Sequence, residues 1–231
     1  MKIAVLTLII GDDYSKTVSL ATQSKKEYCL KHGYDFIIGN DDIYDKSRPI
    51  AWSKIKLIKK HILDYDYIFL SDADVVIMNS KTRLEDLVIK YFEKDTNLLL
   101  TRDQQNLNTG NMIMKCGVDM DKLMDNIYSQ TDFIHSSWWE QSAFIYLFNS
   151  NKYIRDYTRV LEDSHILNAY IVKLPNLELP EKCKYRTGDF LIHLAGIDNK
   201  KTLKDFIDIC IKIQNMEKDD NFNEYVTIVM E

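Results

Sequence analysis

Two aspartates one residue apart, Asp72 and Asp74, are the residues of this sequence whose type and spacing most directly suggest chemistry. They follow an apolar run at 67–70, and in an extended backbone both carboxylates would point to one side while Ala73 points to the other. Two ionised carboxylates this close repel each other and are costly to desolvate unless they share a cation or a proton. Oxygen ligands suit magnesium or manganese, which keep positions open for phosphate oxygens. The pair therefore predicts a divalent metal site that could hold a diphosphate.

The D-x-D pattern after an apolar strand is typical of two classes of enzyme. In haloacid-dehalogenase-like phosphatases the first aspartate is a nucleophile, but the motif normally occupies the first strand. In GT-A glycosyltransferases the motif follows a nucleotide-binding half of alternating strands and helices. Here it follows the third expected strand, and no later G-D-x-x-x-D segment completes a phosphatase site. The layout favours the glycosyltransferase and leaves the phosphatase as a less favoured alternative.

Three further segments place polar residues at the expected ends of strands and helices. They are N-T-G at 108–110, W-W-E-Q-S-A at 138–143 and H-L-A-G at 193–196. Together with D-x-D, and in this order, they resemble the retaining α-galactosyl/α-xylosyltransferase family, glycosyltransferase family 34. The resemblance covers about residues 2–197 and includes H-G-Y-D-F at 32–36 and A-W-S-K-I at 51–55.

The resemblance implies a manganese site, with magnesium as the alternative metal, held by Asp72, Asp74 and His193. Asp74 is expected to bind the metal, and Asp72 to reach the metal or the ribose. His193 would offer a neutral imidazole nitrogen. Ala73 is expected beside the substrate, and Gly196 would let the backbone approach the diphosphate closely.

The resemblance also implies two catalytic residues, Gln141 and Glu140. The amide of Gln141 would lie on the β face of the donor sugar, where a carbonyl dipole can stabilise an oxocarbenium-like transition state. Glu140 would then hold sugar hydroxyls. A double displacement through the Glu140 carboxylate is the alternative mechanism.

The remaining expected substrate contacts come from strands, a helix and a loop. Asn108, Thr109 and Gly110 are expected to line the donor or acceptor sugar. Thr7 would touch the uracil or ribose, and Lys54 the nucleotide or diphosphate.

One segment departs from the family pattern. A basic residue usually follows H-x-x-G closely, whereas here it is delayed to Lys200, with Asp198 intervening. Either Lys200 contacts the diphosphate from a shifted loop, or the metal carries more of the leaving-group charge.

The function implied is a metal-dependent retaining glycosyltransferase that moves a hexose or pentose from a UDP-sugar to a hydroxyl acceptor with α linkage. The expected partners are the UDP-sugar and a glycan or glycosylated protein, with a homodimer left open. A glycogenin-like enzyme of family 8 is the nearest alternative, but its lysine-proline-tryptophan after the H-x-x-G glycine is absent. A catalytically idle nucleotide-sugar-binding subunit is a further alternative.

Alternating strands and helices must position these residues. Apolar runs predict strands at 2–10, 35–38, 67–70 and 97–100, and helical spacing predicts helices at 14–32, 51–63 and 83–92. Such alternation predicts an α/β fold with a mostly parallel, Rossmann-like central sheet and flanking helices. In these sheets ligands bind beyond the carboxyl ends of strands, where Asp72 and Asp74 lie.

The second half of the chain is less regular. We expect helices at 118–129 and 140–148, strands at 171–174 and 190–194, and a closing helix from residue 202. With no linker in view, we expect one GT-A catalytic domain. Its nucleotide-binding half would span about 1–103 and its acceptor and catalytic half about 104–215.

Composition and charge exclude several other classes. The 231 residues are 45% hydrophobic and 28% charged, as in soluble globular proteins, and a net charge of −5 argues against nucleic-acid binding. The four cysteines are far apart and form no metal or disulfide spacing. No apolar run is long enough to span a membrane, and the run at 2–10 predicts a first strand rather than a signal peptide. These features favour a cytoplasmic protein.

Overall fold

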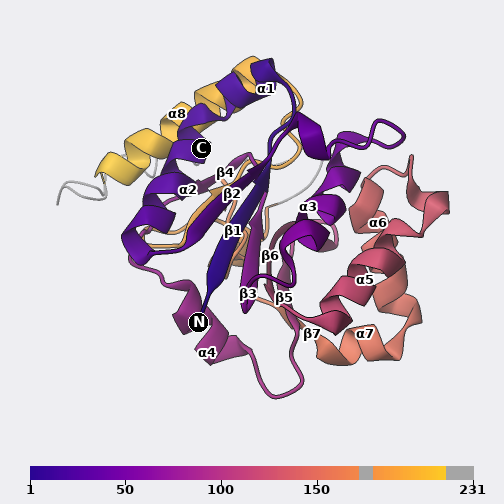
Figure 1. Ribbon diagram of the computed structural model, residues 1–231. Helices are drawn as coiled ribbons and strands as arrows, with labels where there is room; N and C mark the ends of the chain where they lie inside the picture. The colour runs from indigo at the N-terminus through magenta and orange to yellow at the C-terminus, as the bar shows by residue number, and fades with distance from the viewer. Residues whose placement is uncertain (172–178, 217–231) are drawn as a thin grey trace.

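A six-stranded sheet lies at the centre of the computed structural model, which describes residues 1–171 and 179–216 (Figure 1). The strand order is β2-β1-β3-β6-β5-β7. Strands β2, β1 and β3 run parallel, β6 is antiparallel to both of its neighbours, and β7 is parallel to β5. The strands are β1 (Ile3–Leu8), β2 (Asp35–Gly39), β3 (Tyr67–Ser71), β5 (Leu98–Arg102), β6 (Leu107–Lys115) and β7 (Thr158–Leu161).

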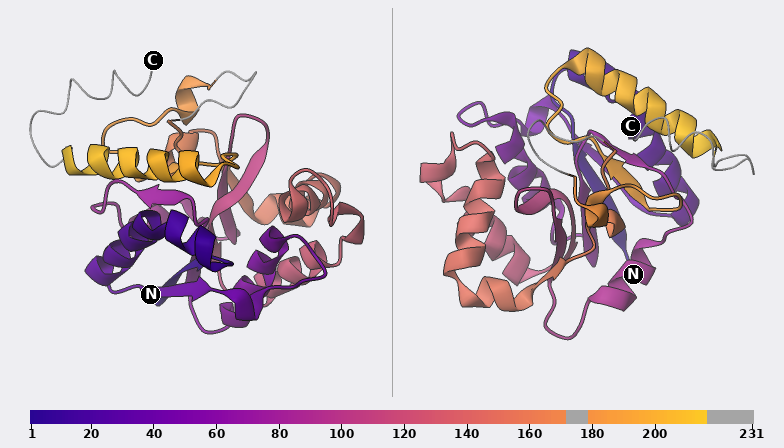
Figure 2. Two further views of the ribbon diagram at one scale, coloured as in Figure 1. Left: turned by 90° about the horizontal axis from the view of Figure 1, so that it is seen from above. Right: turned by 180° about the vertical axis from the view of Figure 1, so that it is seen from behind.

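Helices cover both faces of this sheet, and they separate into two groups on opposite sides of the molecule (Figures 1 and 2). One group holds α1 (Asp12–Thr17), α2 (Ser19–His32) and α8 (Lys200–Met216). The other holds α3 (Ser53–His61), α5 (Val118–Tyr128), α6 (Trp139–Ser150) and α7 (Lys152–Tyr157). The short α4 (Leu84–Tyr91) lies near the amino end of the chain.

Alternation along the strands supplies a core on each face of the sheet. In β1, Leu6 faces the core that contains Trp52, and Val5 faces the core that contains Tyr28. Side chains of this size each contribute about 1.5–3 kcal/mol when fully buried. The sheet is therefore buried on both faces, as an α/β fold requires.

A second, two-stranded sheet fixes the position of the site. It pairs β4 (Val75–Ile77) with β8 (Leu191–His193) in antiparallel register, and Val75 lies opposite His193. Its outer apolar residues pack with α2 and α8 in a third core. The small sheet therefore joins the segment after the two aspartates to the segment that ends in the predicted histidine.

Most of the predicted elements are confirmed within a few residues of their expected ends. The expected helix at 14–32 is instead two helices, α1 and α2, because the backbone at Val18 leaves helical geometry at ψ 13°. The sequence patterns do not predict β4, β7 or α7. The strand expected at 171–174 falls mainly outside the described residues. The chain forms a single domain, and its division into halves near residue 103 stays a prediction.

Among the described residues, no helix combines the length and apolar character needed to cross a membrane.

Candidate active site

The two aspartates lie on a tight connection between β3 and β4. Asp72 follows the last residue of β3, and its backbone N–H donates to the carbonyl of Gly110 on β6 at 2.7 Å. The N–H of Val75 donates back to the carbonyl of Asp72 at 3.2 Å. The 72–74 turn is therefore held by backbone hydrogen bonds at both ends.

His193 reaches this turn from β8, where it lies opposite Val75. Its Nδ1 is 2.6 Å from Oδ1 of Asn168, whose Nδ2 donates to the hydroxyl of Tyr170 at 2.7 Å. Because the amide nitrogen of Asn168 is used this way, its oxygen accepts and Nδ1 of His193 carries the proton. In the neutral ring, the lone pair of Nε2 then faces Asp74 Oδ1, 3.4 Å away.

These three side chains fit a divalent metal ion. One ligand atom from each of Asp72, Asp74 and His193 lies within 4.8 Å of the others. Oδ1 of Asp74 is buried and has no hydrogen-bond partner among the described residues. Two acceptor atoms facing each other at this separation need a cation or a second proton between them. Oxygen and imidazole ligands together suit manganese or magnesium.

The pKa values of the two aspartates differ in direction. Burial raises the pKa of Asp72, partly opposed by Lys54, and the neighbouring charge of Asp74 adds to the increase. Burial also acts to raise the pKa of Asp74, but in the metal-free protein the attraction of a protonated His193 and of Lys25 outweighs it, so this pKa lies below its usual value. Asp74 is therefore the carboxylate that stays ionised most readily, as a metal ligand should.

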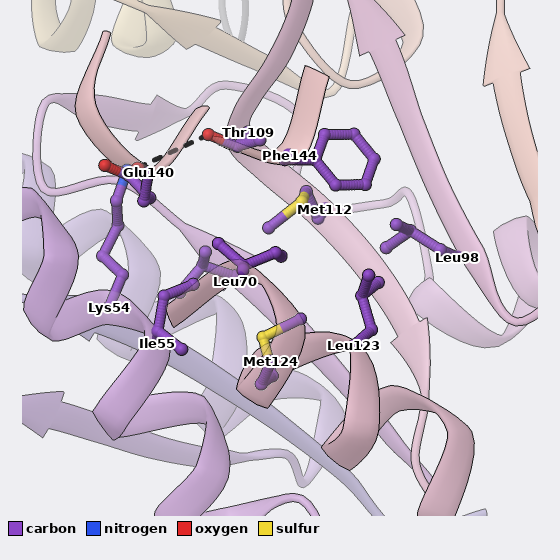
Figure 3. Close-up of a pocket in the computed structure, with 11 residues that line it drawn as sticks. Lys54, Ile55, Leu70, Leu98, Thr109, Met112, Leu123, Met124, Glu140 and Phe144 are labelled. Atoms are coloured by element: carbon purple, nitrogen blue, oxygen red, sulfur yellow. Dashed lines mark hydrogen bonds and ion pairs between the residues drawn. The ribbon is translucent and has the colours of Figure 1, made fainter. Parts of the chain in front are cut away.

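Lys54 of α3 links the 72–74 turn to Glu140 at the start of α6. Its Nζ lies 3.1 Å from Oδ1 of Asp72 and 2.7 Å from Oε1 of Glu140. Burial acts to lower the pKa of Lys54, but attraction to these two carboxylates leaves it above the usual value of 10.5. Figure 3 shows Lys54 and Glu140 meeting at one end of a small cavity whose other walls, apart from Thr109, are apolar.

Gly110 occupies the most crowded position of the site. A Cβ atom there would lie 2.4 Å from Cε1 of His193 and 3.0 Å from Oδ2 of Asp72. Oδ1 of the adjacent Asn108 accepts from the Gly110 N–H at 2.8 Å, and its Nδ2 donates to Oδ2 of Asp103 at 3.0 Å. Glycine is needed here because two metal-site residues pack against the backbone.

Thr109 lies on the opposite side of β6 from its two neighbours, as strand alternation requires. It lines the small cavity of Figure 3, and its backbone N–H donates to Oε1 of Gln141 at 3.0 Å. Trp139, at the start of α6, has a φ of 46°, which is unusual for a bulky side chain. Thr109 thus orients the amide of Gln141, while the strained helix start presents Glu140 and Gln141 to the site.

Two cavities meet at the aspartate turn, one of about 490 Å³ and one of about 550 Å³. Both are within the usual size range for small-molecule sites. Five residues line both: Ala51, Lys54, Asp72, Asp74 and Trp139.

The two cavities differ in character. The first is largely apolar, with Leu8, Ile10, Tyr14, Pro49 and Ile50 in its wall. The second is polar and includes Asp103, Asn108, Gly110, Glu140, Gln141, His193 and Gly196.

Most of the residues predicted for the site are therefore brought together. Ala73 lines the first cavity, and so does Lys200, whose side chain is 58% exposed and lies 4.0 Å from Asp13. Thr7 is not brought there: it is fully buried in β1, and its neighbour Leu8 lines the cavity instead. Thr109 lines neither of the two larger cavities.

Four residues of the site region carry no sequence signal: Lys25, Asn168, Tyr14 and Asp103. Each is one polar or aromatic residue in an ordinary helix or loop, so only the fold shows its position. Trp139, whose backbone is strained, belongs to the same W-W-E-Q motif as the predicted Glu140, so the motif marked this segment but not the strain.

Comparison with known proteins agrees with this geometry. The family model described as the galactosyl transferase GMA12/MNN10 family matches residues 1–99 and 91–204. An uncharacterized alpha-1,2-galactosyltransferase of Schizosaccharomyces pombe is 23% identical over 227 residues, which cover 82% of this chain and 65% of that relative. The chain thus spans less than two thirds of the length of this curated relative.

Solved structures share the fold. A glycosyltransferase involved in the glycosylation of the major capsid of PBCV-1 matches with a TM-score of 0.70 at 13% identity, over 90% of this chain and all of that one. The glycosyltransferase GlyE of Streptococcus pneumoniae TIGR4 matches with a TM-score of 0.56 at 13% identity, over 94% of this chain and 64% of GlyE. The expected GT-A fold and the resemblance to glycosyltransferase family 34 are confirmed. With the family model matching nearly the whole described chain, this protein belongs to the galactosyl transferase GMA12/MNN10 family.

Proposed function

We propose that this protein is a metal-dependent retaining glycosyltransferase that moves a hexose or pentose from a UDP-sugar to a hydroxyl group of a glycan, forming an α linkage. Family membership supports sugar transfer. The observation that carries metal dependence is the cluster of Asp72, Asp74 and His193, whose ligand atoms lie together where two cavities meet.

The different walls of the two cavities support an assignment of the nucleotide to the first cavity and of the sugar to the second. The apolar wall of the first, with Tyr14 and Ile50, suits the planar base of a nucleotide. The polar wall of the second, with Asn108 and Gln141, suits sugar hydroxyls. The aspartate turn between them is where a diphosphate would lie. A divalent cation bound there would neutralise the charge of the departing diphosphate.

The residues around the sugar would act by holding and orienting it. Glu140 is 4% exposed and its Oε1 is ion-paired with Lys54, which favours a role in positioning over direct attack. The acceptor hydroxyl would attack from the face that the diphosphate leaves, and its proton would pass to a phosphate oxygen. The carbonyl oxygen of Gln141 accepts from the backbone N–H of Thr109 at 3.0 Å and from its hydroxyl at 3.3 Å, and the dipole of the carbonyl group held in this way would support the sugar cation.

Thermal unfolding with UDP, GDP and their sugars, each with and without MnCl₂, tests the proposal. We expect UDP and Mn²⁺ together to stabilise the protein, by about 2.7 kcal/mol at a hundredfold excess over the dissociation constant. The same protein should release UDP from one of UDP-galactose, UDP-glucose or UDP-xylose when Mn²⁺ is present.

Two variants make the test specific. His193→Ala and Asp74→Asn should abolish the Mn²⁺-dependent increment, whereas His135→Ala, at an exposed position, should retain it. An unchanged increment in both site variants would refute the metal site. A response to no nucleotide would refute the donor class.

A further inference from the structure

Lys25 is a fully buried lysine in the middle of α2, the helix that packs beside β4 (Figure 1). Its Nζ donates to the backbone carbonyls of Ala73 at 3.3 Å and Val75 at 2.5 Å. Within the described part of the chain, it forms no ion pair with a carboxylate. Its hydrogen bonds are therefore made to the backbone that carries Asp74, not to the aspartate side chain.

Burial of a charged ammonium group in this position lowers the stability of the folded protein. Burial lowers the pKa of Lys25 from 10.5 to about 7, although the charges of Asp74 and Asp72 partly oppose the change. Apolar residues would pack α2 against the sheet without this cost, as the buried Ala21 and Tyr28 do on either side. The ammonium group must therefore contribute something other than packing.

The contribution lies in the backbone of the metal turn. The carbonyls of Ala73 and Val75 both accept from Lys25, and the carbonyl of Asp74 between them accepts from the N–H of Leu194 at 3.1 Å. Three successive carbonyl groups are thus fixed by two partners from distant parts of the chain. With these peptide planes fixed, the direction in which the Asp74 side chain leaves the backbone is fixed as well, and Asp72 is held by the hydrogen bonds of its own N–H and carbonyl groups.

We propose that Lys25 is a positioning residue of the metal site, holding the 72–74 turn in the geometry in which its carboxylates bind a divalent cation. This inference rests on the proposed function, which supplies the cation. Outer residues that orient metal ligands typically change metal affinity by about 10–100-fold when they are removed. A positive charge close to a cation site has the opposite effect, because it repels the cation. The sign of the change on removing Lys25 therefore distinguishes positioning from repulsion.

The test compares Lys25→Met with wild type. Methionine is long and flexible enough to fill the site but has no N–H to donate. We expect Mn²⁺ affinity, measured by calorimetry in the presence of UDP at neutral pH, to fall by roughly 10–100-fold. In the metal-free protein, backbone amides of residues 73–75 should exchange with solvent faster than in wild type.

Ser24 provides a matched control on the same helix. Its Oγ accepts from the N–H of Ile77 at 3.1 Å and donates to the carbonyl of Ala21 at 2.8 Å. It therefore anchors β4 beyond the metal turn. Ser24→Ala should destabilise the fold but leave Mn²⁺ affinity unchanged.

The outcomes separate cleanly. If Lys25→Met binds Mn²⁺ as tightly as wild type or more tightly, or if Ser24→Ala loses as much affinity, the role of Lys25 is refuted. Should Lys25→Met fail to fold, Lys25→Leu, which also has no side-chain donor, is judged by the same affinity criterion, and failure of both variants to fold would assign Lys25 to stability alone. Wild-type protein that binds neither Mn²⁺ nor Mg²⁺ would instead refute the proposed function.

Discussion

His193 is held from two directions, and both bear on how the metal site forms. Oδ1 of Asn168 accepts a hydrogen bond from the Nδ1–H group of His193 and so fixes the tautomer of the ring. Gly110, which has no side chain, leaves room for the ring beside Asp72. The imidazole ring of His193 is thus oriented by the amide group of Asn168 and by the space that Gly110 leaves free. Neither partner belongs to the ligand set itself.

Removal of the Asn168 amide should weaken metal binding without removing a ligand. In Asn168→Ala the imidazole loses the acceptor that keeps its proton on Nδ1, and we expect Mn²⁺ affinity to fall by roughly 10–100-fold. Calorimetric titration checks the value, with Asn126→Ala at an exposed helix position as the control. Equal affinities in the two variants would contradict the role of Asn168.

A single methyl group at residue 110 should disturb the same site. In Gly110→Ala the new Cβ would overlap the ring of His193 at 2.4 Å, so the ring or the strand has to move. Overpacking of this kind costs about 1–3 kcal/mol of folding free energy. Urea unfolding measures that loss, and Mn²⁺ titration should show weaker binding than in wild type. A variant with wild-type stability and affinity would show that the backbone relaxes freely there.

Lys54 is the residue whose loss should destabilise the site most. Lys54→Met would leave the buried carboxylate of Glu140 and the half-buried carboxylate of Asp72 without their shared cation, at a cost of about 3–5 kcal/mol. Lys56→Met removes an exposed ion pair with Asp45 and should cost less than about 1 kcal/mol. The difference in urea midpoint between the two variants measures the effect, and similar midpoints would show that the buried pairs are not needed.

At this scale the sequence predicted the residues that belong to motifs. Asp72 and Asp74 follow an apolar run, and His193 lies at the end of another, shortly before Ala195 and Gly196, which is a pattern that can be read locally. Asn168 and Lys25 act through contacts with segments far away in the chain, so no spacing in the sequence marks them. Thr7 and Thr109 could be placed only once the strand faces were known.

Among the elements, the segment from Asn40 to Trp52 shapes the first cavity. It contributes Pro49, Ile50 and Ala51 to the cavity wall and has only short 3₁₀ turns of its own. Two side chains fasten it: Arg48 stacks over the ring of Tyr128, and Asp45 accepts from the hydroxyl of Tyr128 and from Ser47. The wall of the expected nucleotide site thus depends on α5.

Acid should loosen this segment through Asp45. Its hydrogen bonds from Ser47 and Tyr128 hold the pKa of Asp45 below the usual value of 3.8. Because the folded-state pKa is lowered, the contribution is fully present above the unfolded value and is lost as the pH falls through the folded value. Asp45→Asn should therefore be less stable than wild type at neutral pH, with the difference shrinking below pH 3.8. Urea midpoints across this range give the measurement, and a constant difference would contradict it.

The long elements were predictable and the short ones were not. Helices of eight or more residues show apolar residues at helical spacing, as in α5, and buried strands show a continuous apolar run, as in β3. The three residues of β4 and the four of β7 are too few to show a period, and their pairing depends on strands distant in the sequence. The break between α1 and α2 contains neither proline nor glycine, so the local sequence gives no signal that the helix is interrupted there.

At the scale of the whole molecule, three of the four cysteines are buried and Cys116 is half-buried. The cysteines are free, and burial raises the pKa of Cys29, Cys116 and Cys210 to about 12. Thiols that stay protonated are poor nucleophiles.

Alkylation with iodoacetamide at neutral pH checks this property. We expect these three cysteines to react slowly in the native protein and rapidly in urea, as counted by mass spectrometry. Fast labelling of Cys210 in the native state would mean that α8 detaches from the core.

The pairing of Val75 with His193 has a consequence for how the protein is made. A ribosome adds about 5–20 residues per second, so β3 and the aspartate turn leave it several seconds before β8 exists. During that interval the nascent chain holds two metal ligands, an unpaired β4 and no third ligand. Strands β1, β2, β3, β5 and β6 can already be assembled by then, since all of them precede residue 116. The proposed cation can therefore meet all three of its expected ligands only after synthesis has passed His193.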